Sequence, residues 1–433
     1  MLRTVYILLV LIVVSACGSQ PVSQSEARKL SIIYSGNLDG ELEPCGCSEG
    51  GNKGGIKRRV QKIDELKKEN PNAVLISAGG LLVSEMPQDR LKSEYILKGL
   101  AQLPYDAIGV QWRDLAFSEQ FLLQHSLPWV SSNWLNNDFA ASKLIQSKHT
   151  AVRYFQWLDP ASQSVKNMGL ALVDKNKSQL MQALAAAKTK GETTVLASTL
   201  SLSQLQKEFD LQNVDIAIIK AKYEEFGDPQ QVGHTLILQP GSRGMRIAQL
   251  DLVINPQGKI KSWRHEVIPL PPEVKDAPRM TQWYDDYNAQ VKADYQKRVE
   301  IRKAMDSGES PYAGEKVCQN CHMKQHAKWF DSRHAQAFYA LQDVNKAFDP
   351  DCIACHTVGF EKPGGFIDSS LTANLMHVQC ESCHGAGKAH ADSSGRTSVA
   401  NKNWKPKQMC DQCHIQKHSP DFVFEKYWPK IAH

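Results

Sequence analysis

Short apolar runs alternate with helical patterns over most of the chain between residues 31 and 270. Runs rich in Ile, Val, Leu and Ala recur at 32–34, 73–76, 107–110, 169–173, 194–197 and 215–219. Between two of them, Ile56, Val60, Ile63 and Leu66 fall on one face of a helix whose other face carries Lys and Arg. Strands that alternate with helices predict an α/β domain over residues 31–270.

Two later segments predict how this domain ends. Residues 246–254 alternate apolar and polar positions and run into Asn255-Pro256-Gln257-Gly258, which is typical of a turn, so we expect an antiparallel strand pair here. Prolines then cluster at 269–272. The charged and aromatic stretch that follows predicts a linking helix within residues 271–310.

Residues 311–433 have a different texture, because aliphatic runs give way to Cys, His, Lys and Gly. Such a segment has too few apolar side chains to build an ordinary core, so another group must supply buried apolar surface. Four Cys-x-x-Cys-His motifs point to that group. They comprise Cys318, Cys321 and His322; Cys352, Cys355 and His356; Cys380, Cys383 and His384; and Cys410, Cys413 and His414.

The Cys-x-x-Cys-His pattern is the attachment motif of c-type haem. The two thiols reach the two vinyl groups on one edge of a porphyrin, and the His that follows becomes an axial ligand of the iron. Zinc sites and disulfides are the alternatives, but neither requires a His directly after each Cys pair. The sequence therefore predicts four covalently bound haem c groups as the core of residues 311–433.

The first residues predict export. An apolar run from Tyr6 to Val14 is too short to span a bilayer and suits a signal peptide, and Ser15-Ala16-Cys17 follows it directly. This pattern resembles a bacterial lipobox, which implies a signal peptide over 1–17, a lipid on Cys17 and a polar tether over 18–30; an ordinary signal peptide with an incidental Cys is the alternative. We expect the protein in the cell envelope of a Gram-negative bacterium, facing periplasm or exterior. Gly18 rather than Asp after Cys17 favours the outer membrane.

The C-terminal segment from Gly314 to His433 resembles the cytochrome c-554 family of tetrahaem cytochromes. The likeness includes residues 329–335 (Trp-Phe-Asp-Ser-Arg-His-Ala), residues 378–387 around the third motif, and Ser419-Pro420 after the fourth. It implies a mainly helical fold with haems stacked in close pairs. It also implies distal axial ligands at His334, His390 and His433, whereas His326 and His418 suit propionate partners or surface residues and His377 fits either role.

The same resemblance implies which distal His serves which haem. His390 would complete the haem at Cys318 and Cys321, His334 the haem at Cys380 and Cys383, and His433 the haem at Cys410 and Cys413. The haem at Cys352, Cys355 and His356 would keep an open position. The alternative is that His377 or His326 fills that position.

The α/β region resembles the metallophosphoesterase domain of bacterial 5'-nucleotidases, but its metal ligands are missing. Asn37 and Asp39 stand at the family's first Asp-x-His, Gly80 stands at the bridging Asp, and residues 110–114 replace Gly-Asn-His-Glu. No His follows Ile219, where the family has Gly-His-x-His. Two-metal hydrolysis needs a full cluster of such ligands. We therefore expect the fold without the phosphoesterase chemistry, serving as a docking or positioning module.

One feature is added to the loop after the first strand. Cys45 and Cys47 form a Cys-x-Cys sequence near the ancestral site. Such a pair can form a reducible disulfide or bind a soft metal, so it is a candidate redox pair. A static structural pair is the alternative.

Together these patterns predict an α/β metallophosphoesterase-like domain followed by a mainly α-helical tetrahaem cytochrome domain. We expect extracytoplasmic electron transfer with redox partner proteins, either other cytochromes or a quinol-linked donor, rather than catalysis. The alternative is a redox enzyme acting on a small sulfur or nitrogen compound at the Cys45/Cys47 loop or an open haem. The formal charge of +5 is spread along the chain without a dense basic block, so we expect no nucleic-acid partner.

Overall fold

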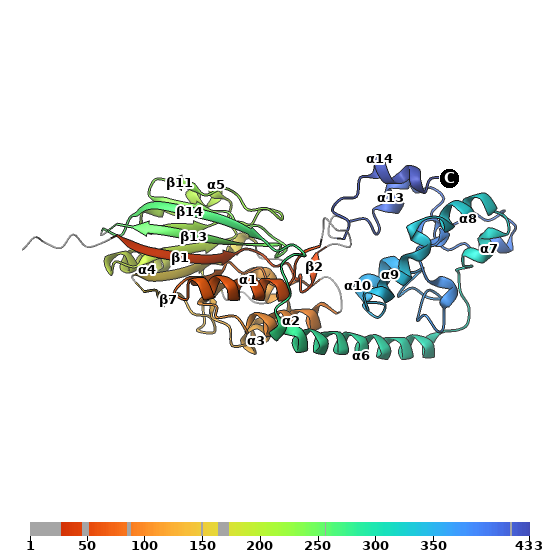
Figure 1. Cartoon of the computed structure of the whole chain (residues 1–433), viewed down its shortest axis with the longest axis horizontal. Coiled ribbons are helices and arrows are strands. Elements are labelled where there is room, and N and C mark those ends of the chain that lie inside the picture. Colours follow the sequence, from red (N-terminus) through yellow and green to blue (C-terminus); the bar gives the residue numbers. More distant parts are fainter. Residues whose placement is uncertain are drawn as a thin grey trace, which may run out of the picture.

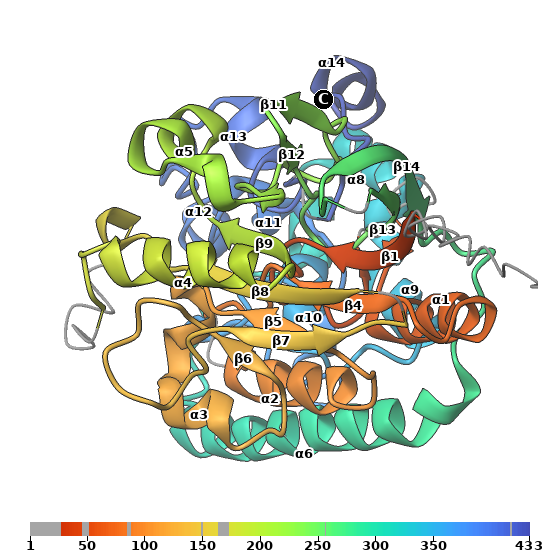
Figure 2. The same cartoon turned by 90° about the vertical axis from the view of Figure 1, so that its left-hand side faces the viewer.

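The computed structural model describes residues 27–45, 52–84, 88–148, 150–162, 173–255, 257–415 and 418–433. Two six-stranded mixed sheets form its N-terminal half (Figures 1 and 2). The first has the order β14 (Ile260–Pro269), β13 (Arg246–Ile254), β1 (Arg28–Ser35), β4 (Val74–Ser77), β5 (Ala107–Gly109) and β6 (Trp129–Val130). The second has the order β11 (Gln230–Val232), β12 (Thr235–Leu238), β10 (Ile216–Ile218), β9 (Thr193–Ser198), β8 (Ala151–Trp157) and β7 (Lys143–Gln146).

The two sheets pack face to face because alternate residues of each strand point to opposite sides. In β1, Ile32 and Tyr34 join a buried cluster shared with Tyr154 and Ile216 of the second sheet, whereas Ile33 belongs to the cluster on the other face. Helices cover both outer faces. The helices of this half are α1 (Ile56–Glu69), α2 (Asp89–Leu100), α3 (Glu119–Leu123), α4 (Ser178–Thr189) and α5 (Leu202–Glu208), and a small pair β2 (Pro44–Cys45) and β3 (Lys53–Gly54) precedes α1.

Several expected elements are present. The predicted antiparallel pair is β13 and β14, and the amphipathic helix is α1, with Ile56, Val60 and Ile63 buried. Strand β8, which lies between β9 and the edge strand β7, was not predicted, because Arg153 and Gln156 interrupt its apolar residues. The strand expected at 169–173 lies almost wholly outside the described residues, as do the signal peptide, Cys17 and Cys47.

The long helix α6 (Thr281–Met305) lies within the expected linking range but is more than a linker. Its buried residues Trp283, Tyr287, Val291 and Tyr295 recur every four positions, so they share one face. The Trp283 indole donates to the Tyr95 carbonyl of α2 at 2.9 Å, and the Tyr295 hydroxyl donates to the Ile367 carbonyl at 3.2 Å. One face of α6 thus joins the two halves of the molecule.

The C-terminal half consists of short helices joined by loops (Figure 1). They are α7 (Glu315–Gln319), α8 (Met323–Phe330), α9 (Ala337–Asp343), α10 (Pro350–His356), α11 (Cys380–His384), α12 (Lys388–Asp392), α13 (Pro406–Cys410) and α14 (Phe424–Tyr427). Phe338, Ile353 and Phe366 of this half are buried in the same cluster as Leu97 and Tyr287. No helix of the described ranges is long and apolar enough to cross a membrane.

Candidate functional site

Each Cys-x-x-Cys-His motif lies on or beside a single helical turn. We number them as site 1 (Cys318, Cys321, His322), site 2 (Cys352, Cys355, His356), site 3 (Cys380, Cys383, His384) and site 4 (Cys410, Cys413, His414). Sites 2 and 3 lie within α10 and α11. In sites 1 and 4 the backbone N–H of the His donates to the carbonyl of the first Cys at 3.0 and 2.9 Å. One helical turn brings positions i, i+3 and i+4 to the same face, so both thiols and the imidazole point the same way.

Three of the four motif imidazoles face a second imidazole. The ring centroids of His322 and His390 are 6.2 Å apart with planes 20° from parallel. His414 lies 6.1 Å from His334, and His384 lies 5.8 Å from His433. A metal–imidazole bond is about 2.0 Å long, so two rings on opposite sides of one ion have centroids roughly 6 Å apart. The three pairs therefore fit one bis-histidine iron each.

Hydrogen bonds orient several of these rings. The Nδ1 atoms of His356, His390 and His433 lie 2.6, 2.7 and 3.0 Å from the carbonyl oxygens of Ala337, Thr397 and Ile431. An N–H donated to a carbonyl fixes the tautomer and leaves Nε2 free to bind a metal. Burial also lowers the pKa of His356, which favours the neutral ring that coordinates iron.

Two of the expected pairings differ from the observed geometry. The family resemblance implied His334 for site 3 and His433 for site 4, but His334 lies beside His414 of site 4 and His433 beside His384 of site 3. The distance along the chain does not determine which motif a distal His reaches, because the intervening loops set its place. His390 faces site 1, as the resemblance implied.

Site 2 differs from the others, because His356 makes no ring contact with another imidazole within the described residues. The two alternative ligands are engaged elsewhere. Nε2 of His326 lies 2.5 Å from a carboxylate oxygen of Glu315. Nδ1 of His377 accepts the backbone N–H of Phe338 at 3.2 Å, and its ring packs edge-on against Tyr339.

Contacts between cysteines order the four sites. The Cys318 thiol of site 1 contacts that of Cys380 in site 3, and the Cys355 thiol of site 2 contacts that of Cys413 in site 4. Cys383 of site 3 lies near Cys410 of site 4, and α11 packs against both α7 and α13. The sites therefore follow the order 1, 3, 4 and 2.

Site 2 is the end of this row that meets the α/β half. Lys92 and Gln88 contact the carboxylate of Asp351, the residue before Cys352. Burial lowers the pKa of the Lys92 ammonium, but the carboxylates of Asp351, Asp349 and Asp89 outweigh that effect and raise it overall. Lys92 is therefore held charged in the interface.

A second ion pair crosses the same boundary. The Lys346 ammonium lies 2.6 Å from the carboxylate of Glu43, 2.8 Å from the Asn288 amide oxygen and 3.5 Å from Asp349. Burial raises the pKa of Asp349. The sequence analysis did not find these interface residues, because each pair joins positions far apart in the chain and no local pattern marks them.

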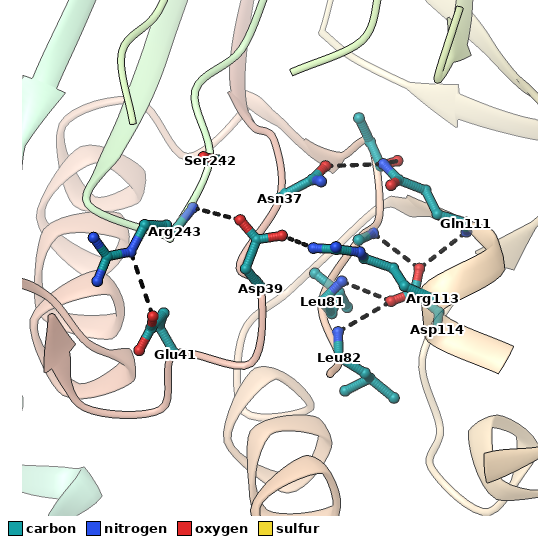
Figure 3. Close-up of polar contacts among 12 residues, drawn as sticks. Asn37, Asp39, Glu41, Leu81, Leu82, Gln111, Arg113, Asp114, Ser242 and Arg243 are labelled. Carbon is teal, nitrogen blue, oxygen red and sulfur yellow. Dashed lines mark hydrogen bonds and ion pairs between the residues drawn. The ribbon is translucent and has the colours of Figure 1, made fainter. Parts of the chain in front are cut away.

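The region where the sequence resemblance placed the phosphoesterase metal ligands is filled by protein groups (Figure 3). The Asp114 carboxylate accepts the backbone N–H groups of Gly80 at 2.9 Å, Leu81 at 2.6 Å, Leu82 at 3.2 Å and Gln111 at 2.9 Å. Burial raises the pKa of this carboxyl group, and the four donors oppose that rise. All four backbone N–H groups thus donate to the single carboxylate of Asp114.

The remaining residues of this site bind one another. Asp39 forms an ion pair with Arg113 and accepts the backbone N–H of Arg243 at 3.0 Å. The Gln111 amide donates to Asn37 at 3.0 Å. A Cβ atom on Gly80, where the family has its bridging Asp, would lie 2.5 Å from Asn37 Cγ, and the residue has a φ of +72°. A metal-bridging side chain has no room there, so the residues do not fit two cations.

No group of three or more His, Cys, Asp or Glu that could hold a metal ion is found in the described parts of the chain. Cys45 lies on β2, whose backbone pairs with β3, and Glu43 of the interface stands two positions before it. The side chain of Cys45 and all of Cys47 lie outside what the structure describes.

Comparisons with known proteins give different matches for the cytochrome-like C-terminal part and for the α/β part of the chain. Residues 317–385 match the family model described as cytochrome c554 and c-prime. Cytochrome c-554 of Nitrosomonas europaea is 32% identical over 136 residues, which are 28% of this chain and 57% of that protein. The chain thus spans little over half the length of this curated relative.

Two solved structures resemble the N-terminal part of the fold. A 5'-nucleotidase precursor from Thermus thermophilus aligns with a TM-score of 0.55 and 17% identity, over 61% of this chain and 59% of that one. The sulfate thiohydrolase SoxB of Thermus thermophilus aligns with a TM-score of 0.52 and 15% identity, over 63% and 61%. At this identity the likeness concerns the fold alone. The predicted fold class, a phosphoesterase-like half followed by a helical cytochrome-like half, is confirmed.

Proposed function

We propose that the protein is an extracytoplasmic, lipid-anchored electron-transfer protein that carries four haem c groups in its C-terminal half. Three imidazole pairs beside Cys-x-x-Cys turns support this proposal. The distance between the two ring centroids of each pair matches that of two imidazoles bound to opposite sides of one iron. Haem c iron exchanges one electron between its ferric and ferrous states. The protein's own residues attach the groups, orient the axial rings and space the sites closely.

The phosphoesterase-like half is proposed as a positioning module without catalysis. Asp114 and Arg113 occupy its ancestral site, and its α2 helix contributes Lys92 to the contact with Asp351 of site 2. In this role the half fixes one end of the row of sites. The lipid on Cys17 would hold the protein to a membrane, with the outer membrane favoured.

Spectroscopy of the purified holoprotein tests the proposal. We expect four haem c groups per chain by intact mass and by haem-specific absorbance, and stepwise reduction of all four in a potentiometric titration. Radiolabelled fatty acid should enter the unaltered protein but not the Cys17→Ser variant. A chain with zinc in place of haem, or haem that no reductant reaches, would overturn the function.

One arrangement favours a second candidate, a redox enzyme. Glu43, two residues before Cys45, is paired with Lys346 next to site 2, and His356 of that site lacks a facing imidazole within the described residues. A substrate oxidised at the Cys45/Cys47 loop or at site 2 would have a row of acceptors beside it. Thiol labelling of Cys45 and Cys47 at controlled potentials tests this candidate. A labelling pattern that stays constant across the accessible range excludes a redox role for the pair.

A further inference from the structure

The order of the sites leaves one end of the row available to another protein. Site 2 is covered by the α/β half through Lys92 and Asp351, and α10 faces that half, whereas α7 and α8 lie at the far end (Figure 1). Sites 1 and 3 stand at the start of the row, and Cys321 of site 1 is exposed. A protein partner that exchanges electrons directly would therefore meet sites 1 and 3.

One segment at these two sites carries an excess of basic residues. Residues 388–407, which we term the basic segment, contain five Lys or Arg residues and one Asp. Lys388 pairs with Asp392, and Lys407 pairs with Asp411. No ion pair of Arg396, Lys402 or Lys405 is found among the described residues, and all three side chains are exposed. An exposed Trp404, with 41% of its surface accessible, lies between the last two.

The basic segment is built directly onto the candidate haem ligands. Its Thr397 carbonyl lies 2.7 Å from Nδ1 of His390, the ring that faces site 1. The Asn401 backbone and side chain donate to the carbonyls of His384 and Cys383 of site 3 at 2.8 and 3.0 Å. A Cβ on Gly385, whose φ is +78°, would lie 2.8 Å from Ala400. The segment thus packs against sites 1 and 3, and its last two residues begin α13, the helix of site 4.

We propose that the basic segment is the docking surface for an acidic redox protein, which exchanges electrons with sites 1 and 3. This proposal rests on the proposed electron-transfer function. Unpaired exposed cations around an aromatic side chain attract a partner of opposite charge and accelerate encounter.

Stopped-flow oxidation of the reduced holoprotein tests the docking surface with two one-electron acceptors. One is plant Cu(II) plastocyanin, which is acidic, and the other is mitochondrial ferricytochrome c, which is basic. In each encounter one ferrous haem becomes ferric while one copper or iron ion is reduced. The triple variant Arg396→Glu, Lys402→Glu, Lys405→Glu should slow the plastocyanin reaction about tenfold at low ionic strength and speed the cytochrome c reaction.

The matched control places the same charge change in the α/β half. The triple variant Lys190→Glu, Lys207→Glu, Lys261→Glu alters exposed lysines there and should leave both rates within about twofold. Equal effects of the two triple variants, or rates that do not fall with added salt in the plastocyanin reaction, would overturn the docking surface alone. An unaltered protein whose haems react with neither acceptor would overturn the electron-transfer function as well. Haem content of every variant is checked by absorbance.

Discussion

At the scale of single residues, the facing imidazoles predict which distal His serves which haem. His433 lies 5.8 Å from His384, so His433→Ala should convert roughly a quarter of the iron to the high-spin state by opening site 3. In a variant that already lacks the site 3 haem, Cys380→Ser with Cys383→Ser, the same substitution should change nothing further. Electron paramagnetic resonance measures both. If His433→Ala produced a further high-spin signal in the variant without the site 3 haem, His433 would instead be the ligand of site 4.

Site 2 carries a separate prediction about ligand binding. His326 and His377 are engaged by Glu315 and by the Phe338 N–H, and among the described residues neither ring makes a ring contact with His356. We therefore expect one high-spin ferric signal in the unaltered protein, from roughly a quarter of the iron, which cyanide or nitric oxide removes. His377→Ala should leave that signal unchanged, as a control. Four low-spin signals with no ligand binding would show that all four haems are bis-histidine.

At the scale of elements, the contact between α2 and α10 predicts that the two halves stabilise each other. Asp351→Asn would leave the buried Lys92 ammonium with the Asp89 carboxylate 3.9 Å away. Breaking one side of a fully buried ion pair costs about 3 kcal/mol, and this pair, with side chains 13% and 20% exposed, should cost less. We expect a clearly lower midpoint of chemical unfolding for the holoprotein. Lys92→Met combined with Asp351→Leu should recover part of the loss.

An exposed pair on the same helix provides the matched control. Lys98 and Glu94 lie 2.6 Å apart on the surface of α2, with side chains about two-fifths exposed at 42% and 39%. Such pairs contribute roughly 0.5 kcal/mol or less. Glu94→Gln should therefore leave the unfolding midpoint nearly unchanged. If Asp351→Asn has as small an effect, the α2–α10 contact does not stabilise the molecule.

At the scale of the whole molecule, the phosphoesterase-like half should work without divalent metals. A side chain on Gly80 collides with Asn37 and Gln111, and Asp39 is neutralised by Arg113. We expect the purified full chain to contain iron but no stoichiometric manganese or zinc, and to hydrolyse no nucleotide or p-nitrophenyl phosphate when either metal is added. Elemental analysis and phosphate release measure this. Tight binding of two metals with turnover would revive the phosphoesterase.

Local patterns in the sequence were enough to predict the common geometry of the Cys-x-x-Cys-His motifs and much of the fold; haem attachment at these motifs stays a prediction. The thiols and imidazole of each motif lie within one helical turn, so neighbouring residues alone determine their common direction. The antiparallel pair β13–β14 was likewise predicted, because a short turn with a recognisable sequence joins the two strands. The sequence already showed a glycine at position 80 in place of a metal-binding aspartate. Only the structure shows that a side chain there would collide with Asn37.

Tertiary structure decided the features that join distant parts of the chain. His334 lies beside the imidazole of site 4 and His433 beside that of site 3, which reverses the assignment that the family resemblance implied, because loop paths bring the two rings of each pair together. The same holds for Lys92 with Asp351, which joins positions 92 and 351 through a buried interface. The sequence alone specified which groups could bind haem, whereas packing determined their partners, their order and the half of the molecule that covers site 2.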